Sequence, residues 1–377
     1  MNFSQLSEWS QLENSAQWLW ISDLLCAIGM LGAALLALVH WRRSITGSAP
    51  GRFDALPTYV LYATFAALSY SVYHRWLEVN HFPSQTMPEV LTMFTLALAV
   101  SQIVLHHALA IHKRSAAWAI LDDVLLVIIL GGVLFTHVYL RGLVTAQRDL
   151  PPALQSYWFP PHLAALIFSY ATLGIAGAIC LVYFVTRFWT GVFMGGYSKK
   201  SQWLILACLV LTPFAHVVTL PVLALGGVVF GLLLLFKKLP GGEAMKNFER
   251  DLDDVSFRAF AVGMPFLTAG LWMGAFWAQE AWANYWGWDS KENSALITWL
   301  IYVVYIHLRL LGGFRGEKAM SVLMGGALSV FITFQVFGYL PDSQKSMHRY
   351  TDDGVQPREG QQGSPREEQQ AARPKDD

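Results

Sequence analysis

The sequence predicts an all-α polytopic membrane protein of about ten transmembrane helices, with a tryptophan-rich loop outside the membrane. Of its 377 residues, 54% are hydrophobic and only 14% are charged, whereas a soluble globular domain carries about 25% charged residues. The mean hydropathy is +0.40, and long apolar runs recur as far as residue 340. These observations exclude a water-soluble enzyme and indicate a chain that crosses a lipid bilayer repeatedly.

The apolar runs define the predicted spans. A bilayer core of roughly 30 Å needs about 20 apolar residues of helix, because unpaired backbone groups are too costly in hydrocarbon. The ten candidates lie near Trp18–Val39, Tyr59–Tyr73, Val90–Ile111, Trp118–Leu140, His162–Phe184, Trp203–Val218, Leu220–Phe236, Ala259–Trp277, Ala295–Leu310 and Met320–Leu340. The sixth and seventh require a tight hairpin around Thr219 and Pro221. A single bent element there would move every later loop to the other side.

The distribution of positive charge predicts the orientation. Lys and Arg number 16 in one set of loops and 4 in the alternate set, and short positively charged loops stay in the cytoplasm. Both chain ends and the loops Arg75–Pro88, Arg141–Pro161 and Ala278–Ser294 are therefore predicted to face outward from an inner, plasma or thylakoid-like membrane. Residues 1–340 are predicted to form the transmembrane domain, and the polar residues 341–377 an external, mostly disordered tail.

Charge and cysteine content exclude further classes of protein. Lys plus Arg equals Asp plus Glu at 26 each, so the chain lacks the basic excess of a nucleic-acid binder. Cys26, Cys180 and Cys208 lie in apolar runs without CxxC or CxxCH spacing. The chain is therefore neither a thiol oxidoreductase nor, by itself, a c-type cytochrome.

An aromatic cluster interrupts the span pattern between residues 276 and 289. It contains four tryptophans and one tyrosine: Trp277, Trp282, Trp286, Trp288 and Tyr285. Tryptophan and tyrosine also form belts at the membrane interface, which for Trp277 alone is an equally good interpretation. The density of rings between two spans instead favours an apolar, water-excluding shelf that a large planar ligand would cover.

Two acidic residues follow the cluster. Asp289 and Glu292 have the spacing of a helix N-cap with an acidic residue at the third helical position. This structural role is favoured over that of a catalytic acid. Lys291 lies between them, either as a partner for a ligand carboxylate or as a solvated lysine.

Three of the 11 histidines stand out as candidate metal ligands, because imidazole nitrogen is the commonest protein donor to transition metals and binds haem iron. His162 and His348 are predicted at the outer ends of their spans, on the side of the aromatic cluster. His307 is predicted near the cytoplasmic end of its span, where an ionisable group is a functional candidate by default. Snorkelling to the nearby interface is the alternative for His307.

The remaining polar residues near span ends carry weaker signals. His40, His106 and His107 are predicted to be ordinary interfacial residues, although His106 or His107 could be a second metal donor. His137 has no aromatic companion. The pair Asp122-Asp123 is either a proton relay within the fourth span or, more simply, lies just before a span that begins at Val124.

The aromatic run resembles the tryptophan-rich "WWD" signature of haem-handling proteins, and most closely that of the CcsA/ResC family of cytochrome c maturation system II. The resemblance extends from Trp277 through Trp299 to the sequence Tyr-Ile-His-Leu-Arg at residues 305–309. A second block, Pro-Ala-Leu-Gln-Ser-Tyr-Trp at residues 152–158 followed by His162, resembles the family segment that carries the first external haem ligand. Residues 80–83, Asn-His-Phe-Pro, approximate a further family motif.

The resemblance implies a role for each matching residue. His162 and His348 would be the external axial ligands of haem b, and His307 an intramembrane ligand at an earlier haem station. The porphyrin would contact the aromatic loop, which comprises Trp277, Trp282, Tyr285, Trp286, Trp288 and Asp289. The resemblance also implies a membrane partner of the ResB/CcsB type that supplies the other intramembrane histidine. Proteins of a thiol-reducing pathway and apocytochrome c, whose CxxCH cysteines receive the haem through thioether bonds, are the other implied partners.

Three interpretations of function therefore remain at the level of sequence. The first is a component of a holocytochrome c synthase complex that exports and presents haem. The second is a haem-dependent electron-transfer or quinol-oxidising membrane subunit, which would hold haem between helices at matched depths. The third is a transporter without a cofactor, in which the aromatic loop is a substrate gate.

Overall fold

The computed structural model describes residues 14–46, 56–109, 116–140, 152–195 and 242–333, together with 199, 202–203, 205–206 and 227. Within these residues the chain is helical and contains no strand. The elements in chain order are α2 (Asn14–Thr46), α3 (Leu56–Val79), α4 (Met87–Leu109), α5 (Ala116–Leu140), the short 3₁₀ helix η2 (Pro152–Gln155), α6 (Phe159–Met194), α9 (Gly242–Trp282), α10 (Ser290–Leu310) and α11 (Glu317–Phe331).

The prediction of a helical, polytopic membrane protein is confirmed, whereas the number of ten spans is not tested. In the part of the chain that the structure describes, five helices are long and apolar enough to cross a membrane: Asn14–His40, Pro88–His107, Phe159–Met194, Gly242–Trp282 and Ser290–Leu310. The predicted hairpin over 203–236 lies mostly outside the described residues. The last predicted span begins in α11 and continues past residue 333, beyond which nothing is described, including the tail from 341.

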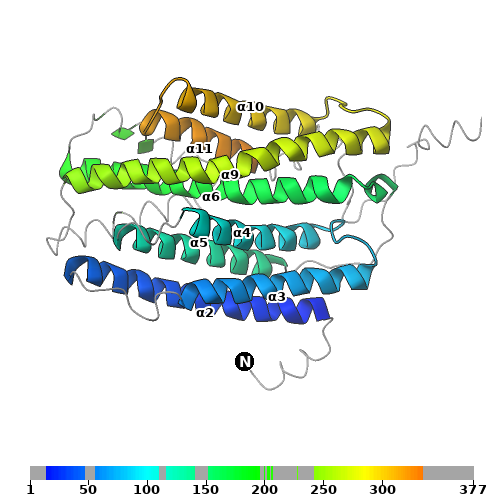
Figure 1. Ribbon diagram of the computed structural model, residues 1–377, viewed down its shortest axis with the longest axis horizontal. Coiled ribbons are helices and arrows are strands. Elements are labelled where there is room, and N and C mark those ends of the chain that lie inside the picture. Colours follow the sequence, from blue (N-terminus) through cyan, green and yellow to red (C-terminus); the bar gives the residue numbers. More distant parts are fainter. Residues whose placement is uncertain are drawn as a thin grey trace, which may run out of the picture.

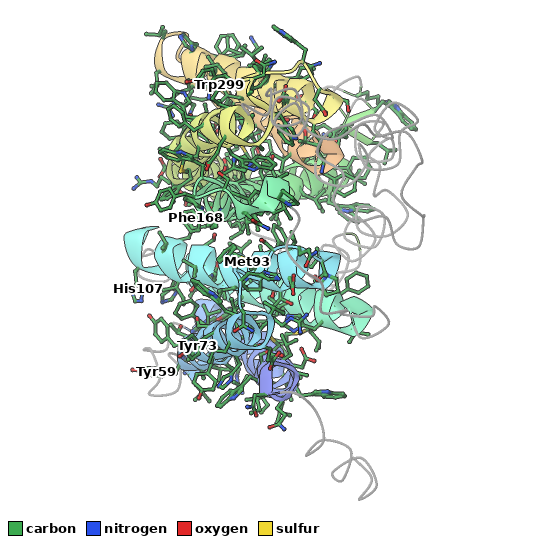
Figure 2. All side chains as sticks on the ribbon, turned by 90° about the vertical axis from the view of Figure 1, so that its right-hand side faces the viewer. Tyr59, Tyr73, Met93, His107, Phe168 and Trp299 are labelled. Atoms are coloured by element: carbon green, nitrogen blue, oxygen red, sulfur yellow. The ribbon has the colours of Figure 1, made fainter. Side chains whose placement is uncertain are left out.

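The helices form two groups that lie one above the other in Figure 1. Helices α2, α3, α4 and α5 pack around one core, and α6, α9, α10 and α11 pack around another. Helix α4 joins the groups by packing on α6. Met93 of α4 and Phe168 of α6 lie at this boundary when the bundle is viewed from its end (Figure 2). A buried hydrogen bond of 2.9 Å between the hydroxyls of Ser101 and Thr172 crosses the same boundary.

Three connecting segments meet at one end of the bundle. Residues 80–86, 152–158 and 283–289 all lie at the right-hand end in Figure 1, which is called the aromatic end below. The Ser156 hydroxyl donates a hydrogen bond of 2.5 Å to the Glu280 carboxylate, across 124 residues of sequence. The predicted alternation of helices had placed these three loops together. That this end faces outward from the membrane stays a prediction.

Helix α9 is much longer than its predicted span. The span was placed at Ala259–Trp277, and the preceding charged residues were assigned to a cytoplasmic loop, but the helix runs from Gly242 to Trp282. Its first half buries Met245, Leu252 and Val255. The charged segment is therefore an amphipathic extension of the helix. Only residues 283–289 remain as the aromatic loop.

Ion pairs join the helices of the second group at the end opposite the aromatic end. Arg187 of α6 contacts Glu249 of α9 at 3.3 Å and Glu317 of α11 at 2.5 Å. Arg309 of α10, only 1% exposed, pairs with Asp253 of α9. These contacts explain why the charged half of α9 is ordered against its neighbours, since buried charges are tolerated when they are paired.

Breaking the Arg309–Asp253 pair should destabilise the protein strongly. Arg309→Met leaves Asp253 as an uncompensated buried charge, which typically costs about 3–5 kcal/mol. We expect a lower thermal unfolding midpoint in detergent. The matched control is the double variant Arg309→Met/Asp253→Leu, which removes both charges and should recover much of the loss. Equal midpoints for the single and double variants would contradict this account.

Candidate functional site

The start of α6 positions a histidine at the aromatic end. Helix α6 begins at Phe159, with proline in its first turn, where the missing backbone N–H is not needed and the fixed φ favours helix. The Trp158 carbonyl accepts a hydrogen bond of 3.1 Å from the His162 backbone N–H. His162 was predicted to open its span, and the structure places it one turn into α6.

The His162 ring is held against α9. Its Nδ1 lies 2.7 Å from the Gly270 carbonyl oxygen, and its ring stacks on Trp277 with centroids 5.5 Å apart at 28°. Because a carbonyl oxygen only accepts hydrogen bonds, Nδ1 carries the proton in neutral imidazole. Nε2 is then the nitrogen with a lone pair, as a metal ligand requires.

Trp277 lies inside the protein and is not part of an exposed shelf. It is 1% exposed, its indole N–H donates a hydrogen bond of 2.7 Å to the Ala153 carbonyl, and its ring packs on Phe159 at 4.9 Å. The sequence interpretation placed it in an outward loop, but α9 is still helical there and this side chain faces α6 and η2. Trp277 therefore forms the wall behind His162.

The other rings divide between this wall and an exposed surface. Trp282, at the end of α9, packs on Trp277 at 4.9 Å. Tyr285 and Trp288 are 55% and 70% exposed, and Trp288 meets Trp286 edge to face at 6.3 Å. The exposed rings come from the loop that follows α9. Of the rings predicted to form an apolar shelf, those of Tyr285 and Trp288 are exposed and that of Trp277 is not.

The loop also presents a buried donor. The indole nitrogen of Trp286 is buried and has no hydrogen-bond partner among the described residues. A buried polar group without a partner costs free energy. A ligand with an acceptor group at this position would remove that cost.

The predicted helix cap is confirmed at the start of α10. The Asp289 carboxylate accepts a hydrogen bond of 2.8 Å from the Lys291 backbone N–H, within a complete capping box. The Glu292 carboxylate accepts from the backbone N–H groups of Asp289 at 3.1 Å and Gly287 at 2.8 Å. Both carboxylates thus fix the end of the aromatic loop, which supports the structural role over that of a catalytic acid.

His307 lies on another surface, far from the aromatic end. It is exposed on α10, with Nδ1 2.7 Å from the Val303 carbonyl oxygen. His307 follows Asp289 by eighteen residues, which correspond to about 27 Å of helix. The structure therefore does not bring His307 and His162 together. His348, the other predicted external ligand, lies outside the described residues.

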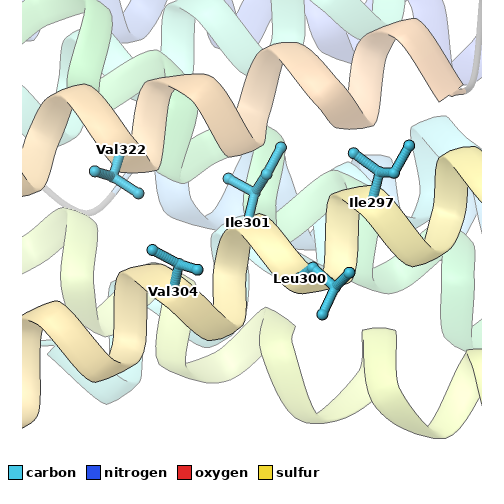
Figure 3. A pocket seen from close by; sticks show the side chains of 5 residues that line it. All are labelled: Ile297, Leu300, Ile301, Val304 and Val322. Carbon is cyan, nitrogen blue, oxygen red and sulfur yellow. The ribbon is translucent and has the colours of Figure 1, made fainter.

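An apolar groove of about 340 Å³ lies on the exposed side of α10, next to α11. Its lining is Ile297, Leu300, Ile301, Val304 and Val322, as Figure 3 shows. His307 follows Val304 by three residues and Leu300 by seven, so the three share one helix face.

Sequence reasoning missed three His–Asp pairs in the first group of helices, of which one is buried and two are partly buried. His137 Nδ1 lies 2.6 Å from Asp23, His106 Nδ1 lies 2.7 Å from Asp122, and His40 Nδ1 lies 2.7 Å from Asp123. Asp122 and Asp123 had been placed before a span, and His40 and His106 at an interface, but all four are within helices and packed against neighbours. An aspartate pair inside an otherwise apolar run was the one available signal.

These pairs do not form a polynuclear or three-ligand metal centre. Among the described ranges, no group of three or more His, Cys, Asp or Glu side chains is arranged to hold a metal ion. The described cysteines, Cys26 and Cys180, are buried and unbonded to each other.

The fold and this site define a class: helical membrane proteins with a histidine set in an aromatic wall at one end of the bundle. A family model described as "Cytochrome C assembly protein" matches residues 87–341. The protein "Cytochrome c biogenesis protein CcsA" of Gloeobacter violaceus is 31% identical over 290 residues, covering 73% of this chain and 80% of its own.

Further relatives with the same name agree. The protein of Rippkaea orientalis is 30% identical over 292 residues, covering 73% of this chain and 82% of its own. That of Gloeothece citriformis is 27% identical over 338 residues, covering 88% and 97%. The chain belongs to the CcsA family of cytochrome c biogenesis proteins, as the resemblance in its sequence implied.

The capping role of Asp289 makes a specific prediction. Asp289→Ala should cost about 0.5–2 kcal/mol at the start of α10, seen as faster hydrogen exchange of the backbone amides of residues 290–293. Asp289→Asn, which caps helices equally well, should leave exchange nearly unchanged. If Asp289→Asn exchanged as fast as Asp289→Ala, the charge and not the cap would be what matters.

Proposed function

We propose that this chain binds haem b at its aromatic end and presents it for covalent attachment to apocytochrome c during cytochrome c maturation. Membership of the CcsA family supports a role in maturation. The observation that carries the haem proposal is the His162 imidazole, whose Nδ1 is engaged by the Gly270 carbonyl and whose ring is backed by Trp277. In this tautomer the lone pair that iron would accept is on Nε2.

The residues present fit a porphyrin. Haem is a large planar apolar ring with two carboxylates, and the aromatic loop offers exposed rings of Tyr285 and Trp288 to cover it. The buried indole N–H of Trp286, without a partner among the described residues, is a donor for a carboxylate. The proposed second axial ligand is His348. Two imidazoles would fill both axial positions and limit access of oxygen to the iron.

The chain contributes positioning to the reaction, and not acid–base catalysis. Haem supplies vinyl groups to which cysteine thiols add. The exposed aromatic rings at the end of the bundle would hold one edge of the haem where the CxxCH segment reaches it, and orientation of this kind contributes much of a rate enhancement. The thiols that add to the vinyl groups would be those of the apocytochrome c CxxCH segment, kept reduced by other proteins. The site is therefore proposed as part of a holocytochrome c synthase complex.

The position of His307 supports a second haem site, occupied before haem reaches the aromatic end. Its Nδ1 is engaged by the Val303 carbonyl, which by the same reasoning leaves Nε2 for metal. It faces outward beside the apolar groove of α10. An imidazole exposed at membrane depth is costly unless a partner covers it. We propose that a membrane partner of the ResB/CcsB type covers this face and supplies the second ligand, so that haem passes from there to the outward-facing aromatic end.

The electron-transfer interpretation is less well supported. It requires histidines that face haem between helices at matched depths. Each of the half-buried His40 and His106 and the buried His137 hydrogen-bonds an aspartate through Nδ1, and His137 also contacts Thr95 through Nε2 at 3.0 Å. His162 is instead at the end of the bundle.

The proposal predicts a haem-containing complex. Purified with its partner, the chain should show a Soret band and reduced b-type bands after dithionite. His162→Ala should lower external haem occupancy at least about tenfold, since changes around a ligand alone typically cost 10–100-fold in affinity. Added imidazole should restore both occupancy and cytochrome c assembly. The matched control is His74→Ala, a histidine of α3 outside the site.

Two results would contradict the proposal. A colourless complex would exclude haem binding and favour a transporter without a cofactor. An unchanged spectrum with full cytochrome c assembly in both His162→Ala and His348→Ala would exclude these residues as ligands.

A further inference from the structure

Side chains of α6 pack directly on three glycines of α9. A Cβ built on Gly263 would lie 2.9 Å from Leu173 Cγ, one on Gly270 would lie 2.6 Å from Leu166 Cδ2, and one on Gly274 would lie 2.6 Å from His162 Cε1. These separations are shorter than van der Waals contact. Gly263, Gly270 and Gly274, called the glycine seam below, therefore form three notches in the α9 surface.

The two helices are in matching register along the seam. On α6 the contacting residues Leu173, Leu166 and His162 are seven and four residues apart. The glycines of α9 have the same spacing in the opposite chain direction, because the helices are antiparallel. Steps of seven and four keep residues on one face of a helix. Two antiparallel helices thus approach closely along one line, and the His162 ring occupies the last notch, nearest the aromatic end.

The last notch differs from the other two because it holds a polar ring that is fixed on three sides. The Gly274 backbone lies beneath the imidazole, with its built Cβ 2.8 Å from Nδ1. The Gly270 carbonyl engages Nδ1 at 2.7 Å, and Trp277 stacks on the ring. A methyl group at 274 has to push the ring away from the α9 backbone. That displacement breaks the Nδ1 hydrogen bond, the stacking or both.

We propose that Gly274 is a positioning residue for haem ligation: the missing side chain lets the His162 imidazole lie flat against α9, with its tautomer and ring plane fixed towards the iron. This rests on the proposed role of His162 as a haem ligand. Contacts that orient a ligating imidazole tune metal affinity and potential. Gly274 touches neither haem nor thiol and acts through His162.

The test uses the full chain in complex with its membrane partner and measures haem occupancy, the reduction potential and the electron paramagnetic resonance spectrum of the ferric form. Gly274→Ala should lower external haem affinity about 10–100-fold and shift both the potential and the g-values, since these report the orientation of axial imidazoles. Gly263→Ala is the matched control, because it lies in the same seam about 16 Å along the helix from Gly274. It should retain the wild-type spectrum and potential.

A rescue experiment separates positioning from packing. In the His162→Gly background the ring that would clash is absent, so added imidazole should restore haem binding equally with or without Gly274→Ala. If Gly274→Ala alone fails to assemble, this double variant still decides the matter. Restoration supports the proposal, whereas a double variant that imidazole does not restore shows that Gly274 serves helix packing only.

The remaining outcomes are also decisive. Wild-type occupancy, potential and g-values in Gly274→Ala would overturn this inference while leaving the proposed function intact, provided that His162→Gly loses haem. The same spectral change in Gly263→Ala would also overturn it. A His162→Gly complex with the wild-type spectrum would remove the proposed ligand, and the role of Gly274 with it.

Discussion

The close antiparallel packing of α6 on α9 is the constraint on which the candidate site depends. Helices in a membrane gain little from apolar burial against one another, because lipid is equally apolar, so small residues that allow close approach carry much of the packing. At Gly270 and Gly274 this approach brings the α9 backbone to the His162 ring. The same packing buries Trp277 behind the ring and lets its indole reach Ala153.

The chain order of helices and the shared end of three loops follow from local pattern, because a run of apolar residues and its flanking charges are properties of neighbouring residues. Helix ends do not follow in the same way. The first half of α9 is charged and was interpreted as a loop, but Glu249 and Asp253 are buried beside arginines of α6 and α10. Those partners are 62 and 56 residues away, and no local pattern reveals them.

In the candidate site, too, local features could be predicted from the sequence and long-range contacts could not. The Asp289–Glu292 capping box is local and was predicted correctly from spacing, and the placement of His162 at the start of α6 followed from the prolines before it. The depth of Trp277 was not predictable, since whether a tryptophan lines a wall or a surface depends on which face of α9 meets α6. The pair formed by Asp23 and His137 spans 114 residues, which places it beyond any argument from spacing.

The His–Asp pairs give the first helix group a role in the geometry of the site. Asp23 and His40 of α2 meet His137 and Asp123 of α5 at opposite ends of the same helix pair, with the apolar layer of Ala33, Leu126 and Leu130 between them. A slip of one turn would break both His–Asp pairs, which costs more than the loss of interchangeable apolar contacts. The pairs therefore select one register for α2 and α5.

The same register is linked to α4 and α6. The His106–Asp122 pair connects α4 to α5, and the hydrogen bond between Ser101 and Thr172 connects α4 to α6. The depth at which α6 presents His162 is thus fixed from one side by α9 and from the other by a polar framework that contributes no group to the candidate site.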